Sequence, residues 1–155
     1  MTFTIRNEEG ADDRDFMLSL SPRFDAVTNA PTHSKDDVRL FHQRFIAQSW
    51  DDAIQVSHNF IAVGDDDTRL GFINLRETED DIANEKCAYI ALIAISAEAT
   101  GLGVAPALIS KAADWARGAG YKRLCLDVFS SNAHAQNFYE KAGFEPETVR
   151  VVKRL

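Results

Sequence analysis

Two glycines stand one residue apart in the stretch EATGLGVAPALIS, between an apolar run and a pattern with helical spacing. Gly101 and Gly103 permit a tight turn and let the backbone approach a ligand closely. A strand that turns into a helix here points several backbone N–H groups at one place, and the helix dipole adds partial positive charge. The turn therefore predicts an anion site for a phosphate group. By itself, the pattern also fits a plain structural corner between a strand and a helix.

A dinucleotide is one candidate for that phosphate. The Rossmann pattern is G-x-G-x-x-G/A after a strand, with an acidic residue near the end of the next strand. Asp127 lies about where that acid should be, but Pro106 occupies the third glycine position. Only 28 residues follow Asp127, which is too few for the further βαβ units of a dinucleotide-binding fold. The dinucleotide interpretation is therefore disfavoured.

Two separated patterns in the second half of the chain favour coenzyme A instead. The first, close to Q/R-x-x-G-x-G/A, falls on Thr100, Gly101, Leu102, Gly103, Val104 and Ala105, just before the helical pattern PALISKAADWA. The second, N-x-x-A-x-x-x-Y-x-x-x-G-F, falls on Asn132, Ala135, Tyr139, Gly143 and Phe144. With this spacing, the chain resembles the GNAT acetyltransferase superfamily over most of its length beyond residue 58.

The resemblance implies one GNAT-like domain over residues 1–155, an α/β fold with a mixed central sheet and helices on both faces. It also implies acetyl-CoA as co-substrate and no metal. The pantetheine arm would pair with the backbone of Ile93, Ala94 and Ile95, and Asn132 would hold it. The pyrophosphate would lie on the phosphate loop, Thr100 to Ala105, chiefly on the N–H groups of Gly101, Leu102, Gly103, Val104 and Ala105.

Tyr139 is the expected catalytic residue. An amine that attacks a thioester expels a thiolate, and a phenol near the sulfur can supply a proton or a strong hydrogen bond. The alternative is a core tyrosine bonded to a backbone carbonyl. The general base is harder to name: Asp127 is a candidate, although a strand-end acid bonded to a neighbouring backbone group is the plainer interpretation. Glu77 and Glu79 are further candidates, because the strand before the loop carries no carboxylate after Glu85.

The expected function is acyl-CoA-dependent N-acyl transfer, with acetyl as the default acyl group. A small-molecule or peptide amine would attack directly in a ternary complex, and a backbone N–H of Ile93 to Ile95 would hold the oxyanion. The alternative is a catalytically silent module that binds or senses CoA. Its support is the missing strand carboxylate and the loop's lack of a cation, since Thr100 and Leu102 replace common polar or basic residues.

Composition narrows the partners. The chain has 155 residues and a formal net charge of −7, so nucleic acid is an unlikely partner for lack of a basic patch. The acidic clusters ADDRD, GDDDTR and ETEDDIANE predict solvated loop tips, and the four histidines predict surface or capped residues rather than metal ligands.

The N-terminus lacks the pattern of an export signal, and no apolar run is long enough for a membrane. We therefore expect a cytoplasmic location, with Cys87 and Cys125 as reduced core thiols. A homodimer is a possible oligomeric state, because dimers are frequent in the family that the chain resembles.

Periodicity predicts the elements that position these residues. Strands are expected at Phe3–Arg6, Phe60–Val63, Leu70–Leu75, Cys87–Ile95, RLCLDV and ETVRVVKRL. Helices are expected at Asp12–Leu20, after a Ser34 cap, from about Pro106, and after an Asn132 cap. The segment SPRFDAVTNAPTH is expected to be a loop because it has two prolines and no period.

Overall fold

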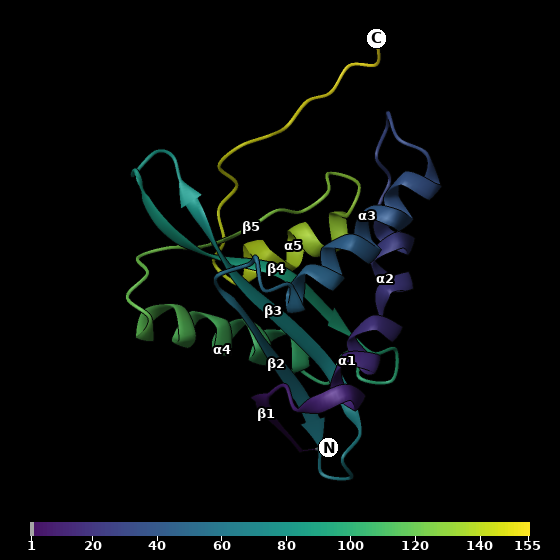
Figure 1. Ribbon diagram of the computed structural model, residues 1–155, viewed down its shortest axis with the longest axis vertical. Coiled ribbons are helices and arrows are strands. Elements are labelled where there is room, and N and C mark those ends of the chain that lie inside the picture. The colour runs from purple at the N-terminus through teal and green to yellow at the C-terminus, as the bar shows by residue number, and fades with distance from the viewer. Residues whose placement is uncertain (1) are drawn as a thin grey trace.

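A computed structural model describes residues 2–155 and shows a five-stranded sheet between two layers of helices (Figure 1). The strands are β1 (Phe3–Asn7), β2 (Ser57–Gly64), β3 (Arg69–Asp80), β4 (Glu85–Ile95) and β5 (Leu124–Leu126). The helices are α1 (Gly10–Ser19), α2 (Ser21–Val27), α3 (Lys35–Ala47), the 3-10 turn η1 (Gln48–Trp50), α4 (Val104–Gly118) and α5 (Ala133–Lys141). Within the described residues, no helix is long and apolar enough to cross a membrane.

The strands lie side by side in chain order, from β1 to β5. The first four pair antiparallel, and β4 pairs parallel with β5. The predicted α/β fold with a mixed sheet is confirmed. The antiparallel pairs also exclude the parallel, doubly wound sheet that a dinucleotide-binding fold requires.

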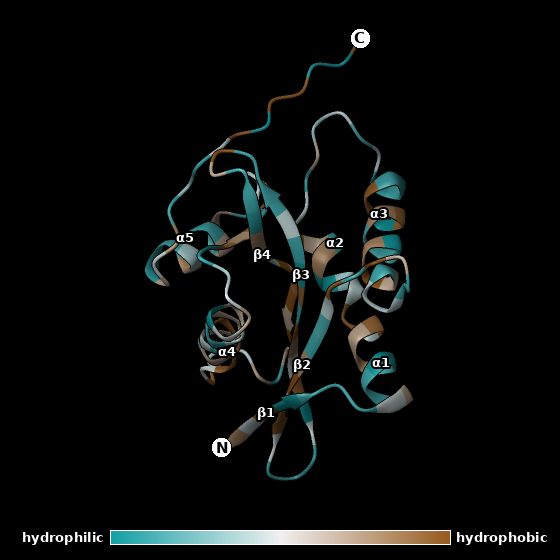
Figure 2. Ribbon diagram, turned by 60° about the vertical axis from the view of Figure 1, so that its left-hand side comes forward, coloured by the Kyte–Doolittle hydropathy of each residue, from teal (hydrophilic) through white to brown (hydrophobic). Residues whose placement is uncertain are grey.

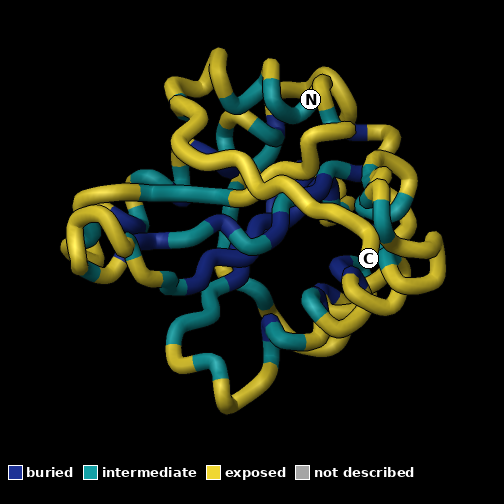
Figure 3. Tube along the Cα trace, turned by 90° about the horizontal axis from the view of Figure 1, so that it is seen from above, coloured by how far each residue is buried: buried dark blue, intermediate teal, exposed yellow. Residues whose placement is uncertain are grey.

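The helices divide between the two faces of the sheet, with α1, α2 and α3 on one side and α4 and α5 on the other (Figure 2). Each face has its own apolar core, because successive side chains of a strand point in opposite directions. Ile73 of β3 packs in the core under α4, whereas the preceding Phe72 packs in the core under α1–α3. The buried residues concentrate in the central strands, and the loops around them are exposed (Figure 3).

Local capping signals were sufficient to place two helix ends. Ser34 and Asp37 form the predicted capping box at the start of α3, where each side chain accepts from the other residue's backbone N–H. Helix α5 ends in the predicted Schellman motif at Gly143, whose φ is 92°. There the Phe144 N–H donates to the Tyr139 carbonyl and the Gly143 N–H to that of Glu140.

Two predicted elements are wrong. We expected the segment SPRFDAVTNAPTH to be a loop, but its first part is helix α2. Pro22 lies in the first turn of this helix, where the missing N–H of proline costs nothing. The expected last strand, ETVRVVKRL, is exposed and pairs with no other strand among residues 2–155. Alternation of apolar residues favours an extended segment but does not supply the neighbouring strand that it needs.

Two further expectations need correction. Asp13, in the acidic cluster that predicted a solvated loop tip, is fully buried in α1. His42 is also buried, and its Nδ1 lies 2.6 Å from an oxygen of Asp25. Asp13 accepts hydrogen bonds from Arg6 of β1 and Arg69 of β3. The partners of Asp13 and His42 lie on other elements, so the local pattern could not reveal these contacts.

Candidate active site

The loop between β4 and α4 holds both predicted glycines in the left-handed conformation. The φ angle is 83° at Gly101 and 79° at Gly103, a region that L side chains rarely adopt. A Cβ added at either position would meet no heavy atom within 4 Å. The loop therefore needs glycine for its shape, and its outer surface borders open space where a ligand can approach the backbone.

Four backbone N–H groups of this loop have no hydrogen-bond partner among residues 2–155: those of Gly101, Gly103, Val104 and Ala105. Two others are used inside the loop. The Leu102 N–H donates to the Ala99 carbonyl at 3.2 Å, and the Thr100 N–H donates to that of Ala97 at 3.3 Å. The expectation that Leu102 also offers its N–H to a phosphate is therefore wrong. The remaining free donors gather at the first turn of a 15-residue helix, as an anion site requires.

The side chains of the loop add no cation. Thr100 donates its hydroxyl to the Ser96 carbonyl at 3.3 Å, and Val104 is buried in the core beneath the loop. The attraction for an anion thus comes from backbone donors and the dipole of α4.

An opening separates β4 from β5 on the side of this loop. The two strands pair only at Ala88–Ile90 and Leu124–Leu126, and β4 then continues to Ile95 with no neighbour on that side among the described residues. A β-bulge lies where they part, because Leu75 pairs with Ile90 and Asn74 pairs with Leu92. The extra residue bends a strand and increases its twist, which accounts for the separation.

The free backbone groups of β4 belong to alternate residues. The Ser96 N–H donates to the Leu70 carbonyl at 2.8 Å, so the groups of Ala94 also face β3 by the alternation of an antiparallel ladder. Those of Ile93 and Ile95 face the opening. Of the three predicted pairing residues, Ala94 is therefore excluded by its bonds within the sheet.

This set of groups fits acetyl-CoA, whose pantetheine arm carries amides and whose diphosphate is an anion. A strand edge can bond the amides as a further strand would, and the loop N–H groups can bond the diphosphate. Ile93, Ile95 and the four free donors of the loop are the residues that would hold it.

Tyr139 packs against the core next to α4 and is half-buried. Its ring meets those of Phe138 and Phe144 edge to face, with centroids 5.3 Å and 5.7 Å away. Burial raises the pKa of the Tyr139 hydroxyl to about 12, so the phenol is protonated at neutral pH. Among residues 2–155 this hydroxyl has no hydrogen-bond partner, and the interpretation as a core tyrosine bonded to a carbonyl is therefore not supported.

Asn132 is the N-cap residue of α5, and this role uses its side-chain oxygen. Its side-chain oxygen accepts from the Ala135 N–H at 3.2 Å, which caps the helix as predicted. No partner of its side-chain NH₂ group lies among the described residues, so this group can still donate to a ligand.

Asp127 directly follows β5, next to the point where β4 and β5 part. It is exposed, and it accepts a hydrogen bond from the Tyr89 hydroxyl of β4 at 2.9 Å. The plainer interpretation, a bond to neighbouring backbone, is therefore replaced by a side-chain contact. Burial and the neighbouring Asp127 carboxylate both raise the pKa of Tyr89, so this phenol remains a hydrogen-bond donor.

The other candidate bases lie on β3, beside the first half of β4. Glu77 accepts from the Tyr121 hydroxyl at 2.6 Å, and Glu79 forms an ion pair with Lys86. They pair across the sheet with Ala88 and Lys86, before the opening begins. Geometry therefore leaves Asp127 as the carboxylate next to the opening among those that the sequence suggested.

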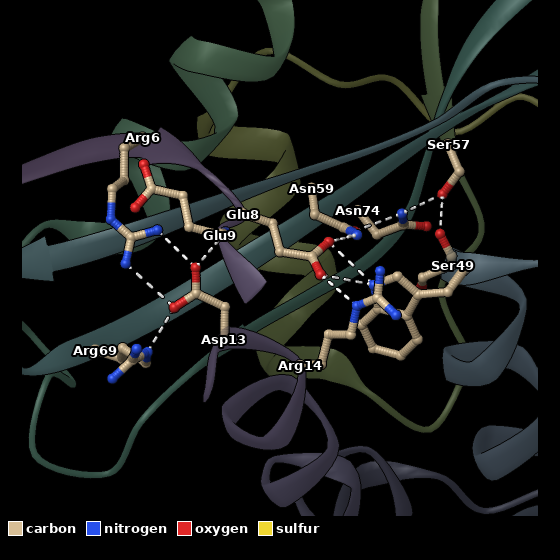
Figure 4. A network of polar contacts seen from close by, with 11 residues as sticks. Arg6, Glu8, Glu9, Asp13, Arg14, Ser49, Ser57, Asn59, Arg69 and Asn74 are labelled. Carbon is tan, nitrogen blue, oxygen red and sulfur yellow. Dashed lines mark hydrogen bonds and ion pairs between the residues drawn. The ribbon is translucent and has the colours of Figure 1, made fainter. Parts of the chain in front are cut away.

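A second polar region, on the α1–α3 face, had no signal in the sequence (Figure 4). Asp13 lies between two arginines and accepts from Arg6 at 2.6 and 3.1 Å and from Arg69 at 2.6 Å. Glu8 accepts from Trp50 at 2.8 Å, from Asn59 at 2.6 Å and from Arg14 at 3.0 Å. These partners come from separate parts of the chain, and they tie β1 and α1 to the rest of the sheet.

The two cysteines are free, as expected, and lie beside each other on β4 and β5 with their sulfurs 3.4 Å apart. Burial raises the pKa of Cys125 to about 12, so this thiol stays protonated at neutral pH.

Comparison with known proteins agrees with this geometry. A family model described as the acetyltransferase (GNAT) family matches residues 24–144. No curated protein sequence matches the chain.

Several solved structures share the fold. A putative acetyl transferase from Pyrococcus furiosus is 25% identical, with a TM-score of 0.77 over 99% of this chain and 100% of the other. A ribosomal-protein-alanine N-acetyltransferase from Brucella melitensis is 17% identical, with a TM-score of 0.70 over 99% and 100%. A predicted acetyltransferase from Clostridium acetobutylicum, solved with acetyl-CoA, is 13% identical, with a TM-score of 0.65 over 99% and 96%.

The family match extends from α2 to the end of α5 and therefore includes the glycine loop, the opening between β4 and β5, and Tyr139. Together with the fold and the free donors of the loop, it shows that this chain belongs to the GNAT acetyltransferase family.

Proposed function

We propose that this protein is an acetyl-CoA-dependent N-acetyltransferase that transfers the acetyl group directly to an amine in a ternary complex. The observation that carries the proposal is the opening beside β4. It combines the free backbone groups of Ile93 and Ile95 with four unpaired N–H donors of the adjoining loop. When bound there, acetyl-CoA would supply an acetyl thioester as the electrophile.

Tyr139 would act at the end of the reaction. Its phenol is protonated at neutral pH and has a hydroxyl without a partner among residues 2–155, so it can donate to a thiolate as that thiolate leaves. The negative charge on the attacked carbonyl oxygen would be held by the N–H of Ile93 or Ile95.

Asp127 would take the proton that the amine must lose. It lies where β4 and β5 part, and the Tyr89 hydroxyl holds its carboxylate at 2.9 Å. Tyr89 would therefore act as a positioning residue. The carboxylate is exposed, which suits a base that works directly or through one water molecule.

The acceptor would be a small-molecule or peptide amine. The chain's net charge of −7 favours a cationic acceptor and disfavours nucleic acid.

A catalytically silent CoA-binding module is the second candidate. Its support is that β4 carries no carboxylate beyond Glu85 and that the loop has no cation. Such a module would bind acetyl-CoA but would acetylate nothing.

One experiment separates these functions. The protein is incubated with acetyl-CoA and a panel of small amines, amino acids and peptides, and released thiol is measured. We expect thiol release that depends on an amine, together with a higher melting temperature in acetyl-CoA but not in NAD or NADP. Stabilisation by acetyl-CoA without turnover of any amine would favour the silent module, and stabilisation by NADP alone would contradict both.

A further inference from the structure

An aromatic cluster lies where α2, α3 and the loop after β5 meet. Its centre is the ring of His42, and the rings of Phe24, Phe41 and Phe129 lie around it with centroids 5.7, 5.2 and 6.2 Å away. Phe41 and Phe129 also meet edge to face at 6.4 Å. These two residues are 38% and 40% exposed, so the aromatic cluster presents a ring surface to solvent that a ligand can cover.

His42 gives the aromatic cluster a polar centre. Its side chain is 5% exposed, and its Nδ1 lies 2.6 Å from a carboxylate oxygen of Asp25. A carboxylate only accepts hydrogen bonds, so Nδ1 carries the hydrogen and Nε2 is the acceptor of the neutral ring. This Nε2 has no partner among residues 2–155 and is not sealed from solvent. A free acceptor atom beside exposed rings indicates a ligand that has an aromatic part and a hydrogen-bond donor.

The aromatic cluster lies on the same face of the sheet as Asp127, the carboxylate next to the opening. Tyr89, which donates to Asp127, pairs across the strands with Arg76. Arg76 in turn donates to the Phe45 carbonyl of α3. Directly paired side chains share a face of the sheet, so Tyr89 and Asp127 lie towards α3. Phe129 follows Asp127 by two residues, which can separate the two Cα atoms by at most about 7 Å.

Space for a small molecule lies beside the aromatic cluster. A cavity of about 520 Å³ lies between residues 26–29 at the end of α2 and residues 131–134 at the start of α5. Asp25 directly precedes the first of these segments, and Phe129 lies just before the second. Asn132, whose side-chain NH₂ group is free to meet a ligand, also lines the cavity. The volume is that of a small-molecule site.

We propose that the acceptor is a primary amine that carries an aromatic ring with a hydrogen-bond donor, such as a phenol. This inference rests on the proposed N-acetyltransferase function and names its substrate class. The nitrogen would lie at Asp127, and the ring would cover Phe41 and Phe129. The hydroxyl of the phenol would donate to Nε2 of His42, which Asp25 holds in position. A short alkyl spacer between nitrogen and ring suits the small separation of Asp127 and Phe129.

Three amines test the ring and the hydroxyl separately. Tyramine has both, phenethylamine lacks the hydroxyl, and butylamine lacks the ring. With acetyl-CoA as co-substrate, we expect kcat/KM to be highest for tyramine, roughly 3- to 10-fold lower for phenethylamine and at least about 10-fold lower again for butylamine. Equal kcat/KM for tyramine and butylamine would overturn the proposal.

Variants assign the preference to the aromatic cluster. Phe129→Ala removes an exposed ring, and we expect kcat/KM for tyramine to fall roughly 10-fold and that for butylamine to fall much less. His42→Phe keeps a ring but removes Nε2, so tyramine should lose its advantage over phenethylamine. Ile82→Ala is the matched control, because Ile82 is 77% exposed in the β3–β4 turn, and it should keep the order of the three amines. Circular dichroism checks the fold of each variant. A full preference for tyramine in Phe129→Ala would overturn the proposal.

Binding without turnover distinguishes a failure of this inference from a failure of the proposed function. Calorimetry measures the affinity for tyramine in the presence of CoA, which supplies no acetyl group. If no amine is acetylated, the proposed function fails, yet tyramine binding that Phe129→Ala abolishes would still support the aromatic acceptor. If amines are acetylated without preference for tyramine, the proposed function stands and this inference is overturned.

Discussion

On the α1–α3 face, the half-buried carboxylate of Glu8 and the fully buried carboxylate of Asp13 each accept several hydrogen bonds, whereas several N–H groups of the loop after β4 have no partner among the described residues. Asp13 accepts from Arg6, Arg69 and the Glu9 N–H. By contrast, the Tyr139 hydroxyl and the N–H groups of Gly101, Gly103, Val104 and Ala105 have no partner among residues 2–155. Buried polar groups normally find partners within the fold. The fully bonded carboxylates therefore indicate a structural role. The loop glycines are exposed, so their N–H groups remain accessible to an anionic ligand.

The largest expected effect comes from blocking the loop. Gly103→Asp places a side chain and a negative charge beside the free N–H donors, at a φ of 79° that aspartate tolerates better than most residues. We expect acetyl-CoA binding to be abolished, as measured by calorimetry, while the protein remains folded. Gly118→Asp adds the same charge at the exposed end of α4 and should retain binding. Unchanged affinity in Gly103→Asp would mean that the phosphates bind elsewhere.

A change of Asp13 on the α1–α3 face should lower the stability of the protein and leave its binding of acetyl-CoA intact. Asp13→Asn removes the charge that two arginines share, and we expect a loss of about 3 kcal/mol in the free energy of unfolding. Chemical denaturation measures it. Asp114→Asn, which removes an exposed ion pair with Arg117, should change stability little. If Asp13→Asn weakened acetyl-CoA binding in the folded protein, the division between the two regions would be wrong.

Low pH should destabilise the protein because it protonates the carboxylate of Asp13. Burial by itself would raise the pKa of Asp13, but hydrogen bonds from Arg6, Arg69 and the Glu9 N–H lower it to about 2. The folded-state pKa is thus below the unfolded one, so the stabilisation is present above about pH 4 and is lost as the pH falls towards 2. We expect about 2 kcal/mol of this loss to be absent from Asp13→Asn in denaturation curves at each pH. Equal acid sensitivity of the two proteins would contradict this assignment.

We expect the smallest effect, a modest fall in kcat, from a change of Tyr89, the residue that positions Asp127. Tyr89→Phe removes the hydrogen bond to Asp127, and we expect kcat to fall by roughly 3- to 10-fold, the usual worth of one hydrogen bond. Acetyl-CoA affinity should be unchanged. Tyr121→Phe removes a similar phenol–carboxylate bond to Glu77, away from the opening, and should leave kcat unaltered. Equal rates for Tyr89→Phe and the unaltered enzyme would remove Tyr89 from the mechanism.

The sequence predicted what short-range signals determine. The Ser34 capping box, the Gly143 helix end and the glycine turn all depend on residues within a few positions of one another, and the structure confirms each. Resemblance to a family then supplied the fold and the expected site.

Contacts between distant parts of the chain could not be predicted in this way. Asp13 meets Arg69, 56 residues away, and no local pattern marks that pair. The direction of the backbone groups at Ala94 depends on the register with β3, which the bulge of β4 fixes. The segment after α5 has the alternation of a strand but lacks a partner in its own sheet.

The most direct test of the proposed function is Tyr139→Phe, which removes one oxygen and keeps the ring that packs between Phe138 and Phe144. Steady-state turnover of an amine and equilibrium binding of acetyl-CoA are measured on the same preparation. We predict that kcat falls by roughly 10²- to 10⁴-fold, the usual worth of a positioned acid, while the Kd for acetyl-CoA changes little. Turnover as fast as that of the unaltered enzyme would contradict the account, because Tyr139 would then be a packing residue only.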